Sequence, residues 1–232
     1  MPTAAFHSGE LLALARAVRG SGSNSADVFG SLSRDLSMRL SEFKAADAVE
    51  LLALLHEGGA RENAAFVAAA DHLASRAGEL TPGQMADCLH VLEQRGVQCA
   101  ALARECAAFF ALYWEGAAAR GAEPADGGRV FARMVSGVAA SGAAPRTFLA
   151  WAAEQLAVQG GCQRFGRRAD LESVSEALEG AGLLTRGGRL AVAADSQRRS
   201  REAEALALNE EPDASYGRTQ AVVPREQAGG RQ

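Results

Sequence analysis

The chain has 232 residues, of which 48% are hydrophobic and 6% aromatic, and it carries a formal net charge of −4 at pH 7. This charge excludes a general polycation that coats nucleic acid, and no apolar run reaches the length of a membrane span. Isoleucine is absent while alanine and leucine are abundant, so the composition disfavours strands and favours helices.

Apolar residues recur at a separation of 37 residues. Phe29 aligns with Phe66 and Leu36 with Leu73, and other pairs keep the same separation: Leu52 and Leu89, Leu55 and Leu92, Gly59 and Gly96. These residues also follow helical spacing, so each unit is predicted to be a pair of helices that buries its core against its neighbours. The sequence therefore predicts an all-α fold, a right-handed α-solenoid of about four helical hairpins with an extended C-terminal tail.

The repeat begins with a single helix. Residues 9–19 are predicted to form a half-repeat that caps the stack. The first 20 residues contain serine, Arg16 and Arg19, so the alternative is the remnant of an organellar transit peptide. The stretch after Met1 lacks the basic and apolar regions of a secretory signal peptide. A helix is the preferred interpretation.

The remaining helices are predicted in pairs, from apolar residues at three- and four-residue steps. They cover residues 25–43 and 46–57, then 62–77 and 82–95, then 100–117 and 129–141, and last a helix from Pro145 and one over 169–179. A loop at 118–128, rich in glycine and alanine, lengthens the third unit by about eight residues.

Local signals support several of these boundaries. Ser25 and Thr81 are predicted to be N-caps, and Pro82 occupies the first position of its helix. Glycines are predicted to end the second helix of a pair, at Gly58-Gly59, Gly96 and Gly182.

The character of the chain changes near Thr185. Mixed charges and a cluster of serine, glutamine and arginine lead into one predicted helix at 196–209, and the sequence after Pro212 is polar. We therefore expect two parts, a helical-repeat domain over 1–184 and a polar tail over 185–232 that is extended outside its helix.

The four cysteines contain no CxxC pair, and they are expected to be reduced thiols that pack within helices in an intracellular compartment. Cys88, His90 and Cys106 are candidates for a zinc site, the alternative being ordinary helix residues. Because Cys88 and His90 are two positions apart on a helix, they face different ways. The sequence predicts no metal site.

No catalytic motif is present. The chain lacks GxSxG, HExxH and GxxxxGK[ST], and Lys44 is its single lysine. Asp47 and Glu50 lie at a predicted helix start, where acidic residues complement the helix dipole. We therefore expect a protein that is not an enzyme, with no cofactor and no small-molecule substrate.

Two groups of residues are candidates for interaction. Phe109, Phe110, Tyr113 and Trp114 are predicted to pack in the core, the alternative being a patch that faces a partner. Two arginine clusters are candidates for contacts to RNA phosphates, Arg164, Arg167 and Arg168 in a loop and Arg198, Arg199 and Arg201 in the tail helix. The alternative is solvated charge, because residues 160–232 carry 11 Arg and 11 Asp+Glu.

The runs DLSMRLSEFKAADAVELLALLHEGGARENAAFV and HLASRAGELTPGQMADCLHVLEQRGVQCAAL resemble the repeats of the octotricopeptide and heptatricopeptide families, including proteins with a RAP domain. The resemblance covers residues 6–182 and implies a mitochondrial or plastid location, RNA processing, or a structural place in a mitochondrial ribosome. The chain departs from these families because no RAP-like domain follows and residues 1–159 carry 13 Lys+Arg against 17 Asp+Glu.

The sequence and the resemblance together suggest a non-catalytic scaffold or adaptor subunit of a mitochondrial ribonucleoprotein, with the mitochondrial ribosome as the preferred assembly. It would dock on other protein subunits, with its arginine-rich loop and tail near rRNA and no membrane contact. The alternative is a freestanding organellar RNA-binding repeat protein that acts in transcript processing or stability. Plastid and cytoplasmic locations are the alternatives to the mitochondrion.

Overall fold

The computed structural model describes residues 6–21, 26–120, 127–158, 162 and 165–209. Over these residues the chain forms ten α-helices and two short 3-10 helices, with no strand. The predicted all-α class is therefore confirmed. The N-cap predicted at Ser25, most of the loop at 118–128 and the polar sequence after Pro212 lie outside the described residues.

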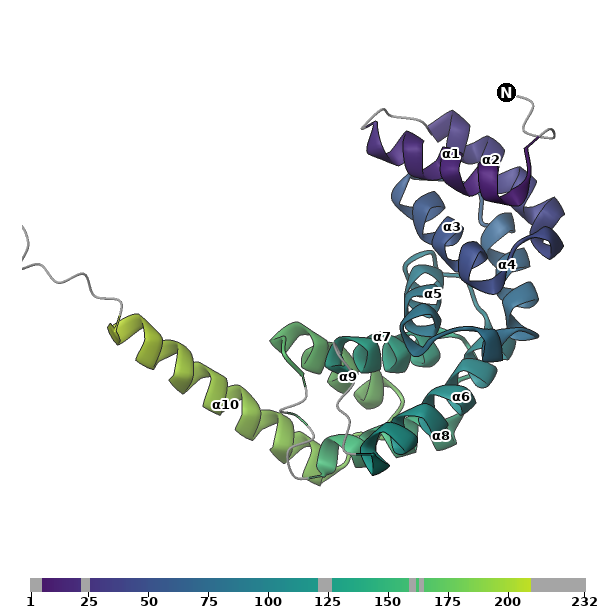
Figure 1. Cartoon of the computed structure of the whole chain (residues 1–232). Helices are drawn as coiled ribbons and strands as arrows, with labels where there is room; N and C mark the ends of the chain where they lie inside the picture. Colours follow the sequence, from purple (N-terminus) through teal and green to yellow (C-terminus); the bar gives the residue numbers. More distant parts are fainter. Residues whose placement is uncertain (1–5, 22–25, 121–126, 159–161, 163–164, 210–232) are drawn as a thin grey trace, which may run out of the picture. The chain divides into compact units, whose positions relative to one another are not determined.

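The helices follow one another in the order shown in Figure 1. Their bounds are α1 (Ser8–Gly20), α2 (Ala26–Arg39), η1 (Leu40–Glu42), α3 (Ala45–Glu57), α4 (Ala64–Ala74), η2 (Ala77–Glu79), α5 (Pro82–Gln94), α6 (Ala100–Ala119), α7 (Gly127–Ala140), α8 (Arg146–Ala157), α9 (Arg168–Gly180) and α10 (Arg186–Asn209).

Helices that follow each other in sequence pack as pairs, and each helix also packs on the helix two positions away. In this way α1 contacts α3, α3 contacts α5, α5 contacts α7 and α7 contacts α9, while α2 contacts α4 and α4 contacts α6. We call α1, α3, α5, α7 and α9 the odd layer and α2, α4, α6 and α8 the even layer. Leucine, alanine and phenylalanine from both layers form one continuous core.

The same set of hydrogen bonds occurs at the two turns η1 and η2, where the chain passes from the even layer to the odd layer. We call these two turns the corners. Arg39 and Arg76 lie 37 residues apart, and each guanidinium donates to a glutamate three residues later, with 2.9 Å from Nε to Oε1 of Glu42 or Glu79. Each also donates to a backbone carbonyl of the preceding pair, Phe6 (2.7 Å) or Phe43 (2.8 Å). These corner arginines therefore tie successive helix pairs together in the same way.

Glycines with a left-handed backbone follow four helices of the odd layer. Their φ angles are 71° at Gly59, 65° at Gly96, 85° at Gly142 and 69° at Gly182. Residues with a Cβ rarely adopt this conformation, whereas glycine adopts it readily and ends helices in this way. The predicted helix ends at Gly59, Gly96 and Gly182 are confirmed.

The start of α5 is confirmed as well. The Thr81 hydroxyl accepts a hydrogen bond from the Gln84 backbone N–H at 3.3 Å, and the Thr81 N–H donates to the Gln84 side chain at 2.9 Å. This reciprocal pair is a capping box. Pro82 follows as the first helical residue.

Two predicted helices end earlier than expected. The helix predicted over 25–43 ends at Arg39 and the one over 62–77 ends at Ala74, each followed by a 3-10 turn. The chain must then become extended, at Phe43 and Leu80, before it enters the odd layer. A tighter last turn is a common way to end a helix at such a corner.

The C-terminal helix begins earlier than predicted, at Arg186 and not at 196. The Thr185 hydroxyl accepts the Gly188 N–H at 3.1 Å, and Ala191 and Val192 pack against the core. The chain divides into two compact units, Met1–Asp195 and Ser196–Gln232. We call them the first and the second compact unit. The boundary expected from composition, after residue 184, stays a prediction.

Candidate interaction surface

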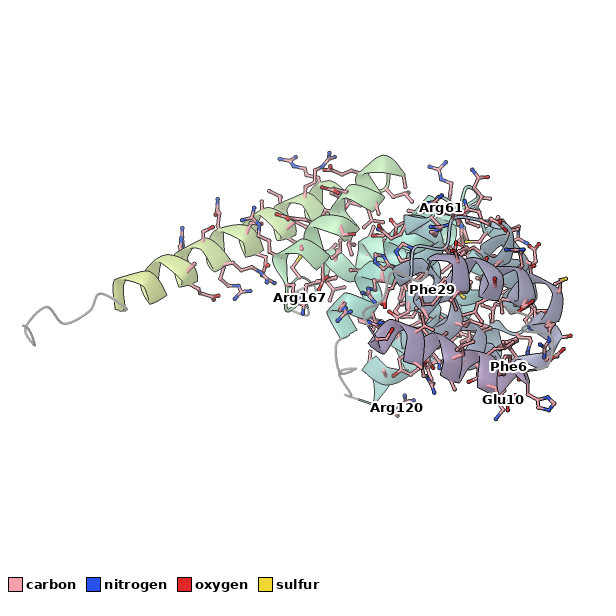
Figure 2. The ribbon with its side chains drawn as sticks, turned by 90° about the horizontal axis from the view of Figure 1, so that it is seen from above. Phe6, Glu10, Phe29, Arg61, Arg120 and Arg167 are labelled. Atoms are coloured by element: carbon pink, nitrogen blue, oxygen red, sulfur yellow. The ribbon has the colours of Figure 1, made fainter. Side chains whose placement is uncertain are left out.

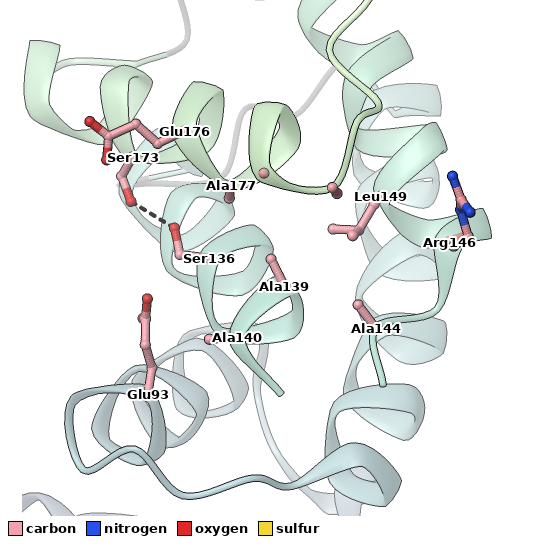
Figure 3. Close-up of a pocket in the computed structure, with 12 residues that line it drawn as sticks. Glu93, Ser136, Ala139, Ala140, Ala144, Arg146, Leu149, Ser173, Glu176 and Ala177 are labelled. Carbon is pink, nitrogen blue, oxygen red and sulfur yellow. Dashed lines mark hydrogen bonds between the residues drawn. The ribbon is translucent and has the colours of Figure 1, made fainter. Parts of the chain in front are cut away.

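Three pockets lie along one face of the first compact unit, across the helices of the odd layer. The first pocket, of about 620 Å³, is lined by α3, α5 and α7. The second, of about 270 Å³, is lined by α5, α7 and α9, and the third, of about 570 Å³, extends from α5 and α7 to α8 and α9 (Figure 3). We call the three together the odd-layer groove.

The pockets are continuous because neighbouring pockets share lining residues. His90, Arg129 and Arg133 line both the first and the second pocket. Glu93, Ser136 and Ser173 line both the second and the third. A single ligand that lay along the groove would therefore contact four successive helices of the odd layer.

Polar contacts between neighbouring helices run along the same face. From α1 to α3, Arg16 Nε lies 2.6 Å from Glu50 Oε1 and Arg19 Nε lies 2.7 Å from Glu57 Oε2. The hydrogen bond to Arg16 is the main cause of a lowered pKa of Glu50. Exposed ion pairs of this kind stabilise a fold only weakly, so their main effect is to fix where the charges lie.

Two further contacts join the later helices. Arg133 of α7 pairs with Asp87 of α5. The hydroxyl oxygens of Ser136 on α7 and Ser173 on α9 lie 2.6 Å apart, the contact drawn in Figure 3. The separation of this serine pair is again 37 residues.

Charged side chains of both signs line the groove. The first pocket is lined by four carboxylates from α3 and α5, those of Asp47, Glu50, Glu57 and Asp87. The second pocket is lined by three arginines from α7 and the start of α9, Arg129, Arg133 and Arg167. Arg129 and Arg133 also line the first pocket, and Glu93 and Asp170 also line the second, so both pockets carry charges of both signs.

His56 and His90 both line the first pocket, and His90 also lines the second. Burial is the main cause of a lowered pKa of His56, with Arg95 and His90 adding to the effect. The Nδ1 atom of His56 is buried without a hydrogen-bond partner among the described residues. His90 Nδ1 lies 3.5 Å from a carboxylate oxygen of Glu93. At neutral pH His56 is therefore a neutral imidazole.

One arginine of the predicted loop cluster reaches the groove. Arg167 is exposed just before α9 and lines the second pocket (Figure 2). Arg168 is directed to Glu172 on its own helix, with 2.6 Å from Nε to Oε1. Arg164 lies outside the described residues.

The predicted tail cluster belongs to the second compact unit. Arg198 pairs there with Glu202, one turn later on α10, at 2.7 Å. Arg199 and Arg201 lie on the same helix, with Arg201 exposed. The described residues of the loop cluster, Arg167 and Arg168, belong to the first compact unit.

The sequence prediction missed Arg129 and Arg133. They lie four residues apart on α7, so they share one side of that helix. The four-residue spacing is visible in the sequence and could have predicted a shared helix side. The sequence does not indicate that this side of α7 lies beside the acidic residues of α3 and α5.

The aromatic group of α6 is divided between the two expected roles. Phe110 and Trp114 are buried, with ring centroids 5.6 Å apart, and Phe131 of α7 packs 4.9 Å from Trp114. Phe109 and Tyr113 keep 43% and 41% of their surface exposed. Core packing therefore holds for the first pair, and the second pair lies at the surface.

The four cysteines are free and buried. Cys88 and Cys106 pack within α5 and α6 as expected, whereas Cys99 is the N-cap of α6 and Cys162 lies outside the α-helices. Burial raises the pKa of Cys106 to about 12 and that of Cys99 to about 11. Cys88 is fully buried, whereas His90 lines the groove, so the two face different ways on α5. No group of three His, Cys, Asp or Glu residues within the described ranges could hold a metal ion.

The chain matches no protein-family model, no curated protein and no solved structure. Among the helices that the structure describes, none is long and apolar enough to cross a membrane.

Proposed function

We propose that this protein is a non-catalytic scaffold or adaptor that docks on other proteins through its odd-layer groove. The observation that carries this proposal is the continuity of three pockets across four helices. A face of this kind offers an extended contact surface, and charged and polar side chains of both signs line it. Such mixed lining suits a protein segment better than a small apolar ligand.

The finer architecture belongs to the same proposal. We take the helix pairs to be about four hairpins of a right-handed α-solenoid with a period of about 37 residues. The corner arginines, the 3-10 turns and the glycines that end helices support this view, because each recurs at a separation of 37 residues in the first two repeats. A solenoid presents a long face for its size, as a scaffold requires.

The proposed setting is a mitochondrial ribonucleoprotein, with the mitochondrial ribosome as the preferred assembly. The resemblance of residues 6–182 to organellar helical repeats supports this setting. Arginines at the start of α9 and in the second compact unit would lie near rRNA, while the acidic body contacts protein subunits.

Sedimentation of a cell lysate tests the proposal. A C-terminally tagged full chain is expressed in its source cells, and the fractions are analysed by mass spectrometry with and without ribonuclease. We expect it to migrate with mitochondrial ribosomal particles and to keep defined protein neighbours after mild ribonuclease treatment. Migration as a free protein, with no stoichiometric neighbour, would contradict the scaffold role.

Arg129, Arg133 and Arg167 around the second pocket favour a second candidate, a freestanding RNA-binding repeat protein. Phosphate contacts by several arginines would give an affinity for single-stranded RNA that falls steeply with salt. A flat or undetectable titration at low salt would reject this candidate.

A further inference from the structure

We propose that two copies of this chain associate through the exposed face of α6, with the two α6 helices antiparallel about a two-fold axis. The proposal goes beyond the scaffold role and does not rest on it, because α6 belongs to the even layer and none of its residues lines the odd-layer groove. It is based on an exposed apolar face and on the order of the side chains along that face.

The exposed face of α6 carries large apolar side chains. Phe109, Leu112 and Tyr113 keep 43%, 69% and 41% of their surface exposed, and their spacing places them side by side on the helix. A Cβ atom at Gly78 would lie 3.0 Å from Cζ of Phe109, so this ring lies against η2 on one side and is exposed on the other. Exposed apolar residues that gather on one face mark an interaction surface.

This face occurs where the first two repeats have a corner. Tyr113 lies 37 residues after the corner arginine Arg76, and Gly116 lies 37 residues after its partner Glu79. In the third repeat α6 continues as helix through this place. The arginine and glutamate that bind each other within the chain at the first two corners are replaced by tyrosine and glycine. The polar corner thereby becomes part of an exposed apolar face.

The side chains along this face are complementary to the same side chains in reverse order. A two-fold contact requires this property, because one surface meets a second copy of itself. With the axis between Leu112 and Tyr113, each residue of α6 faces the residue at the same distance on the other side of the axis. A ring then faces a glycine, and a carboxylate faces a guanidinium. The facing pairs are Leu112 with Tyr113, Phe109 with Gly116, and Glu105 with Arg120, and none of the six is buried.

Glu105 and Arg120 are the charged members of these pairs. Both are exposed, and neither makes an ion pair within the described part of the chain. They lie 15 positions apart, about 22 Å along a helix, so they cannot pair within one chain. In the antiparallel dimer, each carboxylate lies beside the guanidinium of the other copy, at both ends of the contact.

Gly116 leaves room for the aromatic ring of the second copy. A Cβ atom at Gly116 would have Nη1 of Arg120 at 3.4 Å, so this guanidinium borders the place that Phe109 of the other copy would take. Arginine packs favourably on the face of an aromatic ring. The remaining exposed charges of α6 near its middle, Arg104 and Glu115, lie at the margin of the face and do not face a charged residue in this pairing.

The size of the contact predicts a weak dimer. α6 has 20 residues, and a helix of this length is about 30 Å long and about 10 Å wide. One such helix from each copy offers a smaller contact than the about 800 Å² per partner of a standard interface. We therefore expect a dissociation constant that is roughly micromolar.

Sedimentation equilibrium of the purified full chain tests the proposal. Across total concentrations from about 1 µM to about 200 µM, we expect the average mass to rise from the 24.1 kDa of one chain towards twice that value. A monomer throughout this range would overturn the proposal.

A charge exchange tests the pairing itself. Glu105→Arg alone and Arg120→Glu alone each bring like charges together at both ends of the contact, so each should weaken dimerisation by about tenfold. The double variant restores opposite charges and should restore dimerisation. Because the two positions are too far apart to pair within one chain, this recovery requires the antiparallel dimer. Single variants that dimerise like the original chain, or a double variant that does not recover, would overturn the proposal.

Two further variants complete the experiment. Arg104→Glu makes the same charge change as Arg120→Glu at the margin of the face, and it should dimerise like the original chain. Leu112→Ser should weaken dimerisation by about tenfold or more with unchanged urea unfolding, because this side chain is 69% exposed. If Leu112→Ser instead removes a protein neighbour of a chain that is monomeric, the face binds another protein and the proposal fails. A dimer without any other protein neighbour would support the proposal and contradict the scaffold role.

Discussion

At the scale of single residues, His56 lines the first pocket and has a lowered pKa. Its imidazole is partly buried on α3, near Arg95 and His90, and burial is the main cause of its lowered pKa. His72 on α4 also has a lowered pKa, again mainly through burial and then through Arg76. Both side chains are therefore more easily protonated in the unfolded chain than in the folded one.

We predict that the free energy of unfolding decreases as the pH falls below about 6.5, the pKa of an unfolded-chain histidine. Between that value and the lower folded pKa, the unfolded state binds more protons, so acidification favours unfolding. His56→Gln with His72→Gln should reduce this dependence. Urea unfolding at about pH 7.5 and pH 5.5 measures it, and an unchanged pH dependence in the double variant would contradict the prediction.

At the scale of helices, the contact between α5 and α7 depends on a missing side chain. A Cβ atom at Gly137 would lie 2.6 Å from the Cβ of Leu89 and 3.1 Å from its carbonyl carbon. These are backbone and near-backbone atoms, which cannot move without the helix. Gly137 therefore allows α7 to approach α5 closely.

Gly137→Ala is expected to destabilise the protein by about 1–3 kcal/mol, because the two helices must separate. The control is Gly30→Ala in α2, where no heavy atom lies within 4 Å of the added Cβ. That change should stabilise the protein by about 0.5–1 kcal/mol, since alanine favours a helix over glycine. Urea unfolding of both variants measures these changes in the free energy of unfolding. A Gly137→Ala protein as stable as the original would show that α5 and α7 can accommodate the added methyl group.

Helix ends divide into those that the sequence predicts and those that it does not. The capping box at Thr81 and the stops at Gly96 and Gly182 depend on residues next to each other in the chain, so local signals predict them. The corner after α2 depends on a bond from Arg39 to the carbonyl of Phe6, 33 residues away. Such a bond has no local signal, and for this reason the 3-10 turns were predicted as helix.

At the scale of the first compact unit, each helix contacts mainly its neighbours. The terminal helix α1 packs on α2 and α3, with Leu11 and Leu12 buried against them. In an arrangement of this kind, a local defect need not be felt by helices several steps away.

Leu11→Ala should cost about 2–5 kcal/mol, the usual range for a leucine deleted from a core. We expect amide hydrogen exchange to accelerate in α1, α2 and α3 and to stay unchanged in α7 and α9. Ala13→Ser, at an exposed position of α1, is the control and should leave exchange close to that of the original chain. Equal acceleration in every helix would instead indicate a single cooperative unit and count against the solenoid.

The groove illustrates the limit of sequence-based prediction at this scale. The core could be predicted, because each unit repeats the same apolar positions, as Phe29 and Phe66 do. Part of the charge of the groove repeats as well, because Glu50 and Asp87 lie 37 residues apart and are both acidic. Arg129 and Asp87 are brought to one pocket by packing across α5 and α7, and the longer third unit removes any fixed spacing between them.

The single lysine has a consequence for chemistry performed on this protein. Lys44 is exposed at the N-cap of α3, next to the corner that Arg76 joins. Amine-directed reagents, and any enzyme that attaches a tag to lysine side chains, therefore have one side-chain target on the whole chain. Amine cross-linking would report neighbours of that corner and of the adjoining end of the first pocket, which Ala46 and Asp47 line. The carboxylates and guanidiniums of the rest of the groove need reagents of their own.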